Sequence, residues 1–351
     1  MVNNRFAAAK AAYTTRHVRL ESIDQVVTYG RPGAGDLVLA RVAELGQHPR
    51  LELADGRRAA LYEGEEIIVA YGNRYAPDQF EAVIPDNLGP CDLVAAGGIA
   101  GRTLSRHAAM LEPTRLEPVG LLCDAAGRRS NLRDWRLPDP CRPDAAPHTI
   151  AVVGTSMNAG KTTTAAGIIR GLSSAGHRVA AAKITGTGAG GDLWLMTDAG
   201  AAPVLDFTVA GFASTYLCEP DEVLSSMRIL WGHLANEAPD VIVLEVADGL
   251  YQRETASLLA SAEFAQIVDA VVFAAGDAMG AVGGVAALRG LGLPVVAASG
   301  LLTASPLATR EAQAAIDVPV LTLEDLFALP SVLVPAPSFA ASPTRVATGI
   351  I

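Results

Sequence analysis

Residues 149–163, which read TIAVVGTSMNAGKTT, constrain this chain more than any other stretch. An apolar, strand-like run breaks here into the pattern G-x-x-x-x-G-K-T. Gly154 and Gly160 permit a tight turn that points successive backbone N–H groups into one concavity. Lys161 supplies an ammonium group for the β- and γ-phosphates of a nucleotide, and the Thr162 hydroxyl is placed to ligate Mg²⁺. The run therefore predicts a nucleotide-binding loop, or P-loop, whose other members are Thr155, Ser156, Met157, Asn158, Ala159 and Thr163.

The residues after this loop have the spacing of a helix. Ala165, Ile168, Ile169 and Leu172 stand at positions i, i+3, i+4 and i+7, and Gly176 is a suitable stop. A helix that begins here aims its positive N-terminal end at the phosphates. A strand before the loop and a helix after it favour a ligand-binding loop over a glycine-rich turn without a ligand.

Length and composition limit the classes of protein to consider. A chain of 351 residues suggests two domains. No run of about eighteen uninterrupted apolar residues occurs, so we expect no membrane partner. The formal net charge of −10 argues against a nucleic-acid partner, because such binding relies on a basic face. The four cysteines lack C-x-x-C spacing and the first residues lack a long apolar segment, so a cytoplasmic protein with reduced thiols is expected.

The first part of the chain has the pattern of short strands. Apolar runs at 37–42, 50–53 and 66–71 are separated by turn signals, without a helix of 10–15 residues between them. We therefore predict a β-rich, barrel-like domain over 1–140, a Pro-rich linker over 141–148, a P-loop domain over 149–330 and a Pro/Ala-rich tail over 331–351.

Within the first part, a glycine-rich stretch at 97–101 precedes Arg102, Arg106 and His107. Two interpretations stay open. The arginines can hold a carboxylate or phosphate, since guanidinium groups bind such anions with two parallel hydrogen bonds. Alternatively, the stretch is a turn into a helix whose polar face is solvated.

The second part alternates strands and helices. Strands are predicted at 178–183, 240–245, 269–275 and 294–298, with helices at 220–237 and 281–291 and an edge strand at 318–321. This alternation predicts an α/β fold with a doubly wound, mostly parallel sheet. Ligands of such sheets bind at the carboxyl ends of the strands.

Several of these strands end in or near residues that can take part in catalysis or metal binding. Glu245 ends a hydrophobic run, as a Walker-B acid does, and with Thr162 and Asp192 it is a candidate Mg²⁺ ligand. Lys183 is a candidate second cation for a transferring phosphoryl group, or else a solvated lysine capping a loop. Lys161, Lys183, Glu245 and Asp248 are therefore the candidate catalytic residues, and the candidate substrate contacts are Lys183, Thr185, Thr187 and Asp206.

The second part resembles two known families over about residues 149–325. Its P-loop, Lys183 with the glycines that follow, and Glu245 are similar to the corresponding motifs of dethiobiotin synthetases, with Val246-Ala247-Asp248 where that family has glycines. The run Thr185-Gly-Thr-Gly and the later Leu205-Asp206-Phe207 also resemble the P-loop half of D-glutamate N-acetyltransferase-like proteins.

Three functions follow. The first is an Mg-ATP-dependent kinase or ligase acting on a small polar, carboxylate-bearing metabolite, and we expect the protein to be a homodimer. The second is a nucleotide switch or chaperone-like NTPase whose first domain grips a protein partner. The third, implied by the acetyltransferase resemblance, is a P-loop transferase that uses acyl-CoA. ATP is favoured over GTP because residues 297–300 read AASG and carry no guanine-reading N-K-x-D sequence.

Overall fold

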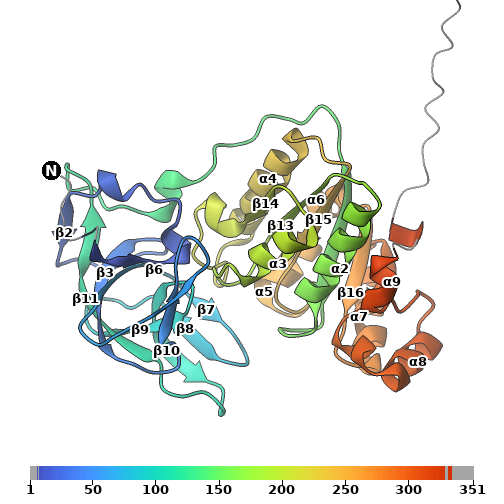
Figure 1. Cartoon of the computed structure of the whole chain (residues 1–351), viewed down its shortest axis with the longest axis horizontal. Coiled ribbons are helices and arrows are strands. Elements are labelled where there is room, and N and C mark those ends of the chain that lie inside the picture. The colour runs from blue at the N-terminus through green and yellow to red at the C-terminus, as the bar shows by residue number, and fades with distance from the viewer. Residues whose placement is uncertain (1–5, 7, 329–330, 334–351) are drawn as a thin grey trace, which may run out of the picture.

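The computed structural model describes residues 6, 8–328 and 331–333 of the chain. It has an α/β fold in which two parts lie side by side (Figure 1). The β-rich part comprises residues 8–135 and the P-loop part residues 148–328, and an irregular connection joins them. Within these described residues, no helix has the length and apolar character needed to cross a bilayer.

The P-loop part is built on a parallel sheet of six strands in the order β14-β13-β15-β12-β16-β17. The strands are β12 (His148–Gly154), β13 (Val179–Lys183), β14 (Val204–Asp206), β15 (Val241–Glu245), β16 (Ala270–Ala274) and β17 (Val295–Ser299). The helices are α2 (Lys161–Ser174), α3 (Gly191–Ala199), α4 (Pro220–Asn236), α5 (Arg253–Leu259), α6 (Ala262–Ile267), α7 (Ala278–Gly290), α8 (Pro306–Ala315) and α9 (Leu323–Phe327).

Helices cover both faces of this sheet because its strands are apolar on both faces. Ile150 and Val152 of β12 pack in one core with α2, α3 and α9, whereas Ala151 and Val153 pack in the opposite core with α4, α7 and α8. Each fully buried Val, Leu or Ile side chain contributes roughly 1.5–3 kcal/mol. The predicted doubly wound arrangement is therefore the one that buries these strands.

The β-rich part is a mixed sheet. Its strands are β1 (Lys10–Ala11), β2 (Gln25–Val27), β3 (Leu37–Glu44), β6 (Glu66–Tyr71), β7 (Arg74–Tyr75), β8 (Phe80–Val83), β9 (Cys91–Ala95), β10 (Ile99–Arg106) and β11 (Thr114–Cys123). Hydrogen-bonded pairs lead from β6 through β3, β11, β9 and β10 back to β6. A separate ribbon pairs β4 (Arg50–Glu52) with β5 (Arg58–Ala60).

Two sequence-based expectations need correction. The stretch after Gly98 does not enter a helix: it forms β10, which pairs with β8 and β9 after a turn in which Gly98 has a φ of +98°. The predicted edge strand at 318–321 is reduced to a single bridge between Val320 and Ala298. The predicted tail over 331–351 lies outside the described residues except for Ser331–Leu333.

Candidate functional site

The P-loop connects β12 to α2 and depends on both of its glycines. A Cβ atom on Gly154 would lie 2.8 Å from the Ala274 carbonyl oxygen and from Lys161 Cγ. Gly160 has a φ of +93°, and a Cβ there would meet the backbone of Gly300 and Leu301 at 2.9–3.2 Å. Larger residues would therefore displace the loop from the edge of the sheet.

A cavity of about 370 Å³ opens beside this loop. Its volume falls in the range of small-molecule sites. All of the predicted catalytic and metal-binding residues line it: Lys161, Thr162, Lys183, Asp192, Glu245 and Asp248. The P-loop residues Met157, Asn158, Gly160 and Thr163 line it as well.

Strand register explains how residues distant in sequence meet here. Lys183 is the direct neighbour of Glu245, since β13 and β15 are adjacent parallel strands that end at the same level. The strand β12 lies on the other side of β15 and delivers the P-loop to the same edge. Asp192 enters from the first turn of α3.

The polar side chains of the cavity form one connected network. Thr162 Oγ1 lies 2.9 Å from Glu245 Oε1 and 3.1 Å from Asp192 Oδ1, and its single proton serves one of them at a time. The Lys183 ammonium donates to Asp192 Oδ2. Lys161 Nζ instead donates to the Ser156 carbonyl oxygen at 2.8 Å, a hydrogen bond within the P-loop itself.

Burial sets the charges of the acids. Burial, followed by repulsion from Asp192, raises the pKa of Glu245 to about 7. Burial also raises the pKa of Asp248. For Asp192, burial acts in the same direction, but the attraction of the Lys183 ammonium outweighs it and the pKa is lowered. Asp192 is thus the firmly ionised acid of the site.

The pKa values of the two lysines are shifted in opposite directions. Burial lowers the pKa of Lys161, against the attraction of Glu245 and Asp248. Burial acts on Lys183 too, but its contacts with Asp192 and Glu245 outweigh this and raise its pKa. Lys183 therefore keeps its charge and is the stronger cation of the cavity.

The oxygen atoms of this network suit a hard divalent cation. Glu245 Oε2 is buried and has no hydrogen-bond partner among the described residues. It lies in the same network as Thr162 Oγ1 and the Asp192 carboxylate, and oxygens of this kind are the ligands of Mg²⁺. No cluster of three His, Cys, Asp or Glu side chains suited to a metal occurs in the described part of the chain. Phosphate oxygens and water would therefore have to complete the coordination.

Three predicted substrate contacts do not line the cavity. The Thr185 hydroxyl donates to the Ala247 carbonyl oxygen, and Thr187 forms a bridge with Ser214. Asp206 is 2% exposed, and its carboxylate accepts hydrogen bonds from Tyr13 and Arg16 of the β-rich part. All three side chains are thus engaged within the protein, and Asp206 joins the two parts.

The arginines of the 97–107 stretch also lie away from the cavity lining. Arg102 is exposed on β10. Arg106 is paired with Glu112 at 2.6 Å and donates to the Met110 carbonyl oxygen. Neither arginine therefore contributes to the lining of the P-loop cavity.

The β-rich part reaches the site through residues that sequence reasoning missed. Asp78, in the turn between β7 and β8, accepts a hydrogen bond of 2.8 Å from Asn158 of the P-loop. Glu52, at the end of β4, accepts one of 3.1 Å from the Gly190 backbone N–H. The alternation Arg50-Leu-Glu52 reads as an exposed acid after a buried leucine, so no local signal marks Glu52 as a buried contact.

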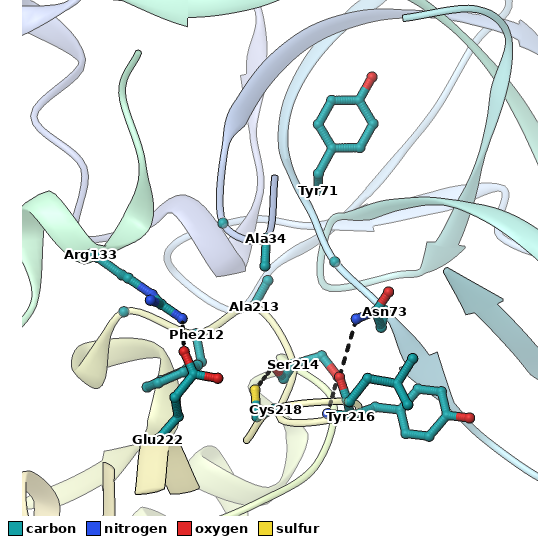
Figure 2. A pocket seen from close by; sticks show the side chains of 14 residues that line it. Ala34, Tyr71, Asn73, Arg133, Phe212, Ala213, Ser214, Tyr216, Cys218 and Glu222 are labelled. Atoms are coloured by element: carbon teal, nitrogen blue, oxygen red, sulfur yellow. Dashed lines mark hydrogen bonds and ion pairs between the residues drawn. The ribbon is translucent and has the colours of Figure 1, made fainter. Parts of the chain in front are cut away.

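A second pocket, shown in Figure 2, lies between the two parts. Arg133 and Glu222 form an ion pair on one side of it, and Asn73 donates to the Tyr216 carbonyl oxygen on the other. Its volume of about 140 Å³ is below the range of nucleotide-sized sites. The larger cavity beside the P-loop is therefore the candidate site.

No protein-family model and no curated protein matches this chain. Two solved structures of the signal recognition particle receptor FtsY from Elizabethkingia anophelis are similar to it at 16% identity, one of them in complex with GDP. They cover 57% and 54% of this chain and 68% and 60% of their own, with TM-scores of 0.32 and 0.31. Similarity at this level assigns no activity to the chain.

Proposed function

We propose that this chain is an Mg²⁺- and ATP-dependent enzyme that transfers a phosphoryl group to a small polar, carboxylate-bearing metabolite, as a kinase or a ligase. The observation that carries the proposal is the convergence of two lysines, the Thr162 hydroxyl and three carboxylates in one cavity at the end of β12, β13 and β15. Phosphoryl transfer needs positioning and charge neutralisation more than covalent participation.

The residues divide the work as follows. Lys161 exchanges the Ser156 carbonyl oxygen for phosphate oxygens when a nucleotide enters. Lys183, freed from Asp192, neutralises the charge that develops on the transferred group. Thr162, Asp192 and Glu245 would hold Mg²⁺, which supplies charge neutralisation to the phosphates when bound. Asp248, whose pKa burial raises, is suited to accept the proton of the acceptor group.

The preference for adenine is a further part of the proposal. A neighbouring cavity of about 400 Å³ shares the lining residues Gly160, Thr163 and Leu301 with the P-loop cavity. Leu301 and Leu323 line it and are 58% and 39% exposed, which suits contact with the flat face of a base. The absence of N-K-x-D at 297–300 favours adenine over guanine.

The remaining proposals concern architecture and assembly. The return of strand pairing to β6 supports a small barrel in the β-rich part, and the irregular connection near 138–147 supports a domain boundary there. A homodimer, without a nucleic-acid or membrane partner, remains our expectation, and light scattering of the purified protein tests the oligomeric state.

A second candidate function is a nucleotide switch that acts on a protein partner. The hydrogen bond between Asn158 of the P-loop and Asp78 of the β-rich part favours it, because a nucleotide that moves the P-loop would disturb this contact. Such a switch predicts slow hydrolysis that no small metabolite accelerates.

Calorimetry with Mg-ATP and Mg-GTP, combined with an assay of ADP release, tests the proposal. We expect ATP to bind more tightly and carboxylate-bearing metabolites to accelerate ADP release. Lys161→Ala should abolish binding, and Glu245→Gln should weaken the Mg²⁺ dependence far more than binding of the nucleotide alone. Tighter GTP binding would overturn the adenine preference, and wild-type turnover in Lys161→Ala would overturn the site.

A further inference from the structure

The loop between Lys183 and Asp192 connects two groups that are bonded to each other in the candidate site. Residues 184–190 lead from the end of β13 to the start of α3, and Gly190 is the residue before the first turn that carries Asp192. The position of this loop therefore decides where the Asp192 carboxylate stands relative to Thr162.

Glu52 of the β-rich part holds the end of this loop. Its side chain is 2% exposed, and Oε1 accepts the hydrogen bond from Gly190 N. A Cβ atom on Gly190 would lie 2.6 Å from this oxygen and 2.5 Å from Trp194 Nε1, so Gly190 is packed too closely for any side chain. Burial raises the pKa of Glu52, against the hydrogen bond from Gly190.

Other residues of the β-rich part hold the loop from the same side. A Cβ on Gly97 would overlap the Gly188 carbonyl oxygen, and one on Gly188 would lie 2.8 Å from Thr14 Cγ2. Next to Lys183 in the sheet, Asp206 is bonded to Tyr13 and Arg16. The loop is thus packed against the β-rich part at several points along its length.

We propose that Glu52 is a positioning residue for the metal and phosphate site, and that it acts by fixing Gly190 so that Asp192 stays within reach of Thr162. The inference rests on the proposed function for its consequence but not for the contact itself. When a nucleotide enters and Lys183 turns to the phosphates, Asp192 loses one partner. The hold on Gly190 then keeps the carboxylate at the site.

Three variants of the full chain test this role. Glu52→Ala removes the acceptor, Glu52→Asp withdraws it by one methylene while keeping the charge, and Glu52→Gln restores an acceptor oxygen of the same reach. Asp92→Ala is the matched control. Asp92 is a 3% exposed carboxylate of the β-rich part that bonds Thr103 N and Arg115, both within that part.

The first measurement is hydrogen exchange of residues 184–192 in the protein without nucleotide. We expect exchange to accelerate by about tenfold or more in Glu52→Ala, less in Glu52→Asp, and little in Glu52→Gln or Asp92→Ala. Exchange in Glu52→Ala equal to that of the wild type would overturn the positioning role, whatever the chain does with nucleotides.

The second measurement is the Mg²⁺ concentration that half-saturates the gain in binding of a fluorescent ATP analogue. Loss of a group that orients a metal ligand weakens metal affinity by about 10- to 100-fold. We expect a shift of about tenfold in Glu52→Ala, with recovery in Glu52→Gln and unchanged binding without Mg²⁺. An equal shift in Asp92→Ala would show a merely structural effect and overturn the inference. Absence of any Mg²⁺ effect in the wild type would overturn the proposed function, while the exchange result would still stand.

Discussion

At the scale of single residues, the proposed function assigns Lys183 to catalysis rather than to nucleotide binding. On that proposal Lys183→Ala removes a cation that would face the transferred group, and we expect kcat to fall on the order of 10²-fold. The dissociation constant of ATP should change far less, because Lys161 and the P-loop amides remain. Steady-state kinetics and calorimetry give the two numbers. Asp192→Asn serves as a companion, since it removes the negative charge beside Lys183 and leaves the cation in place. Unaltered kcat in Lys183→Ala would mean that the acceptor binds elsewhere.

His48 makes stability depend on pH. Burial, with repulsion from Arg74, lowers the pKa of His48 to about 4 from its ordinary 6.5. The unfolded chain therefore binds a proton in this range that the folded chain refuses, so stability rises with pH between these values and is lost as pH falls through them. We expect the free energy of unfolding to fall by about 3 kcal/mol from this residue between pH 7 and pH 4.

Urea denaturation of the wild type and of His48→Gln at several pH values measures this contribution. Carboxylates titrate in the same range in both proteins, so the difference between the two curves isolates the histidine. Parallel curves would show that His48 is freely protonated in the folded protein.

At the scale of elements, the turn between β9 and β10 meets the 184–190 loop at Gly97. A methyl group there would overlap the Gly188 carbonyl oxygen, which belongs to the backbone and cannot rotate away. We expect Gly97→Ala to destabilise the protein by about 1–3 kcal/mol. Gly283→Ala is the control: it lies within α7 with open space around its Cβ, and should stabilise by about 0.5–1 kcal/mol. Chemical denaturation measures both changes in the free energy of unfolding, and changes of the same sign in the two variants would contradict this account.

Elements in the P-loop part were predictable from sequence where a buried, apolar strand ends in a charged residue. The strands ending at Lys183 and Glu245 and the helix after Gly160 stand where they were expected, because parallel strands buried on both faces read as apolar runs. The strand over residues 99–106 is not predicted by the sequence pattern. This strand exists through its pairing with β8 and β9, and such pairing leaves no helical or alternating pattern for local reasoning to use.

The candidate site was predictable for the same reason, and only in part. Lys161, Lys183 and Glu245 end or follow strands, so their convergence follows from topology. The role of Asp206 did not follow, because its partners Tyr13 and Arg16 lie about 190 residues earlier in the chain. Contacts between parts of a protein depend on how the parts pack, which single-sequence patterns do not record.

At the scale of the whole molecule, Asp206 anchors the two parts to each other. The Arg16–Asp206 pair has side chains only 10% and 2% exposed, and Tyr13 Oη donates to the same carboxylate at 2.5 Å. We expect Asp206→Asn to cost about 3–5 kcal/mol, because it leaves a buried guanidinium without its counter-charge. Glu263→Gln breaks the exposed pair with Arg228 and should cost about 0–1 kcal/mol. Similar losses in the two variants, measured by denaturation, would show that the buried pair does not anchor the parts.

The connection between the parts has a consequence for how the chain can be divided. Residues 139–146 are almost entirely exposed, so a protease can reach them without unfolding either part. A tether of this kind keeps its two ends at an effective concentration on the order of millimolar. Once it is cut, the contacts between the parts, among them those of Glu52, Tyr13 and Arg16, must hold them together at the protein concentration of the sample. Dilution would then separate the two parts and abolish the proposed activity. A P-loop part expressed alone would lack the partners of Asp206 and the contact that holds Gly190, so we expect it to bind nucleotide poorly.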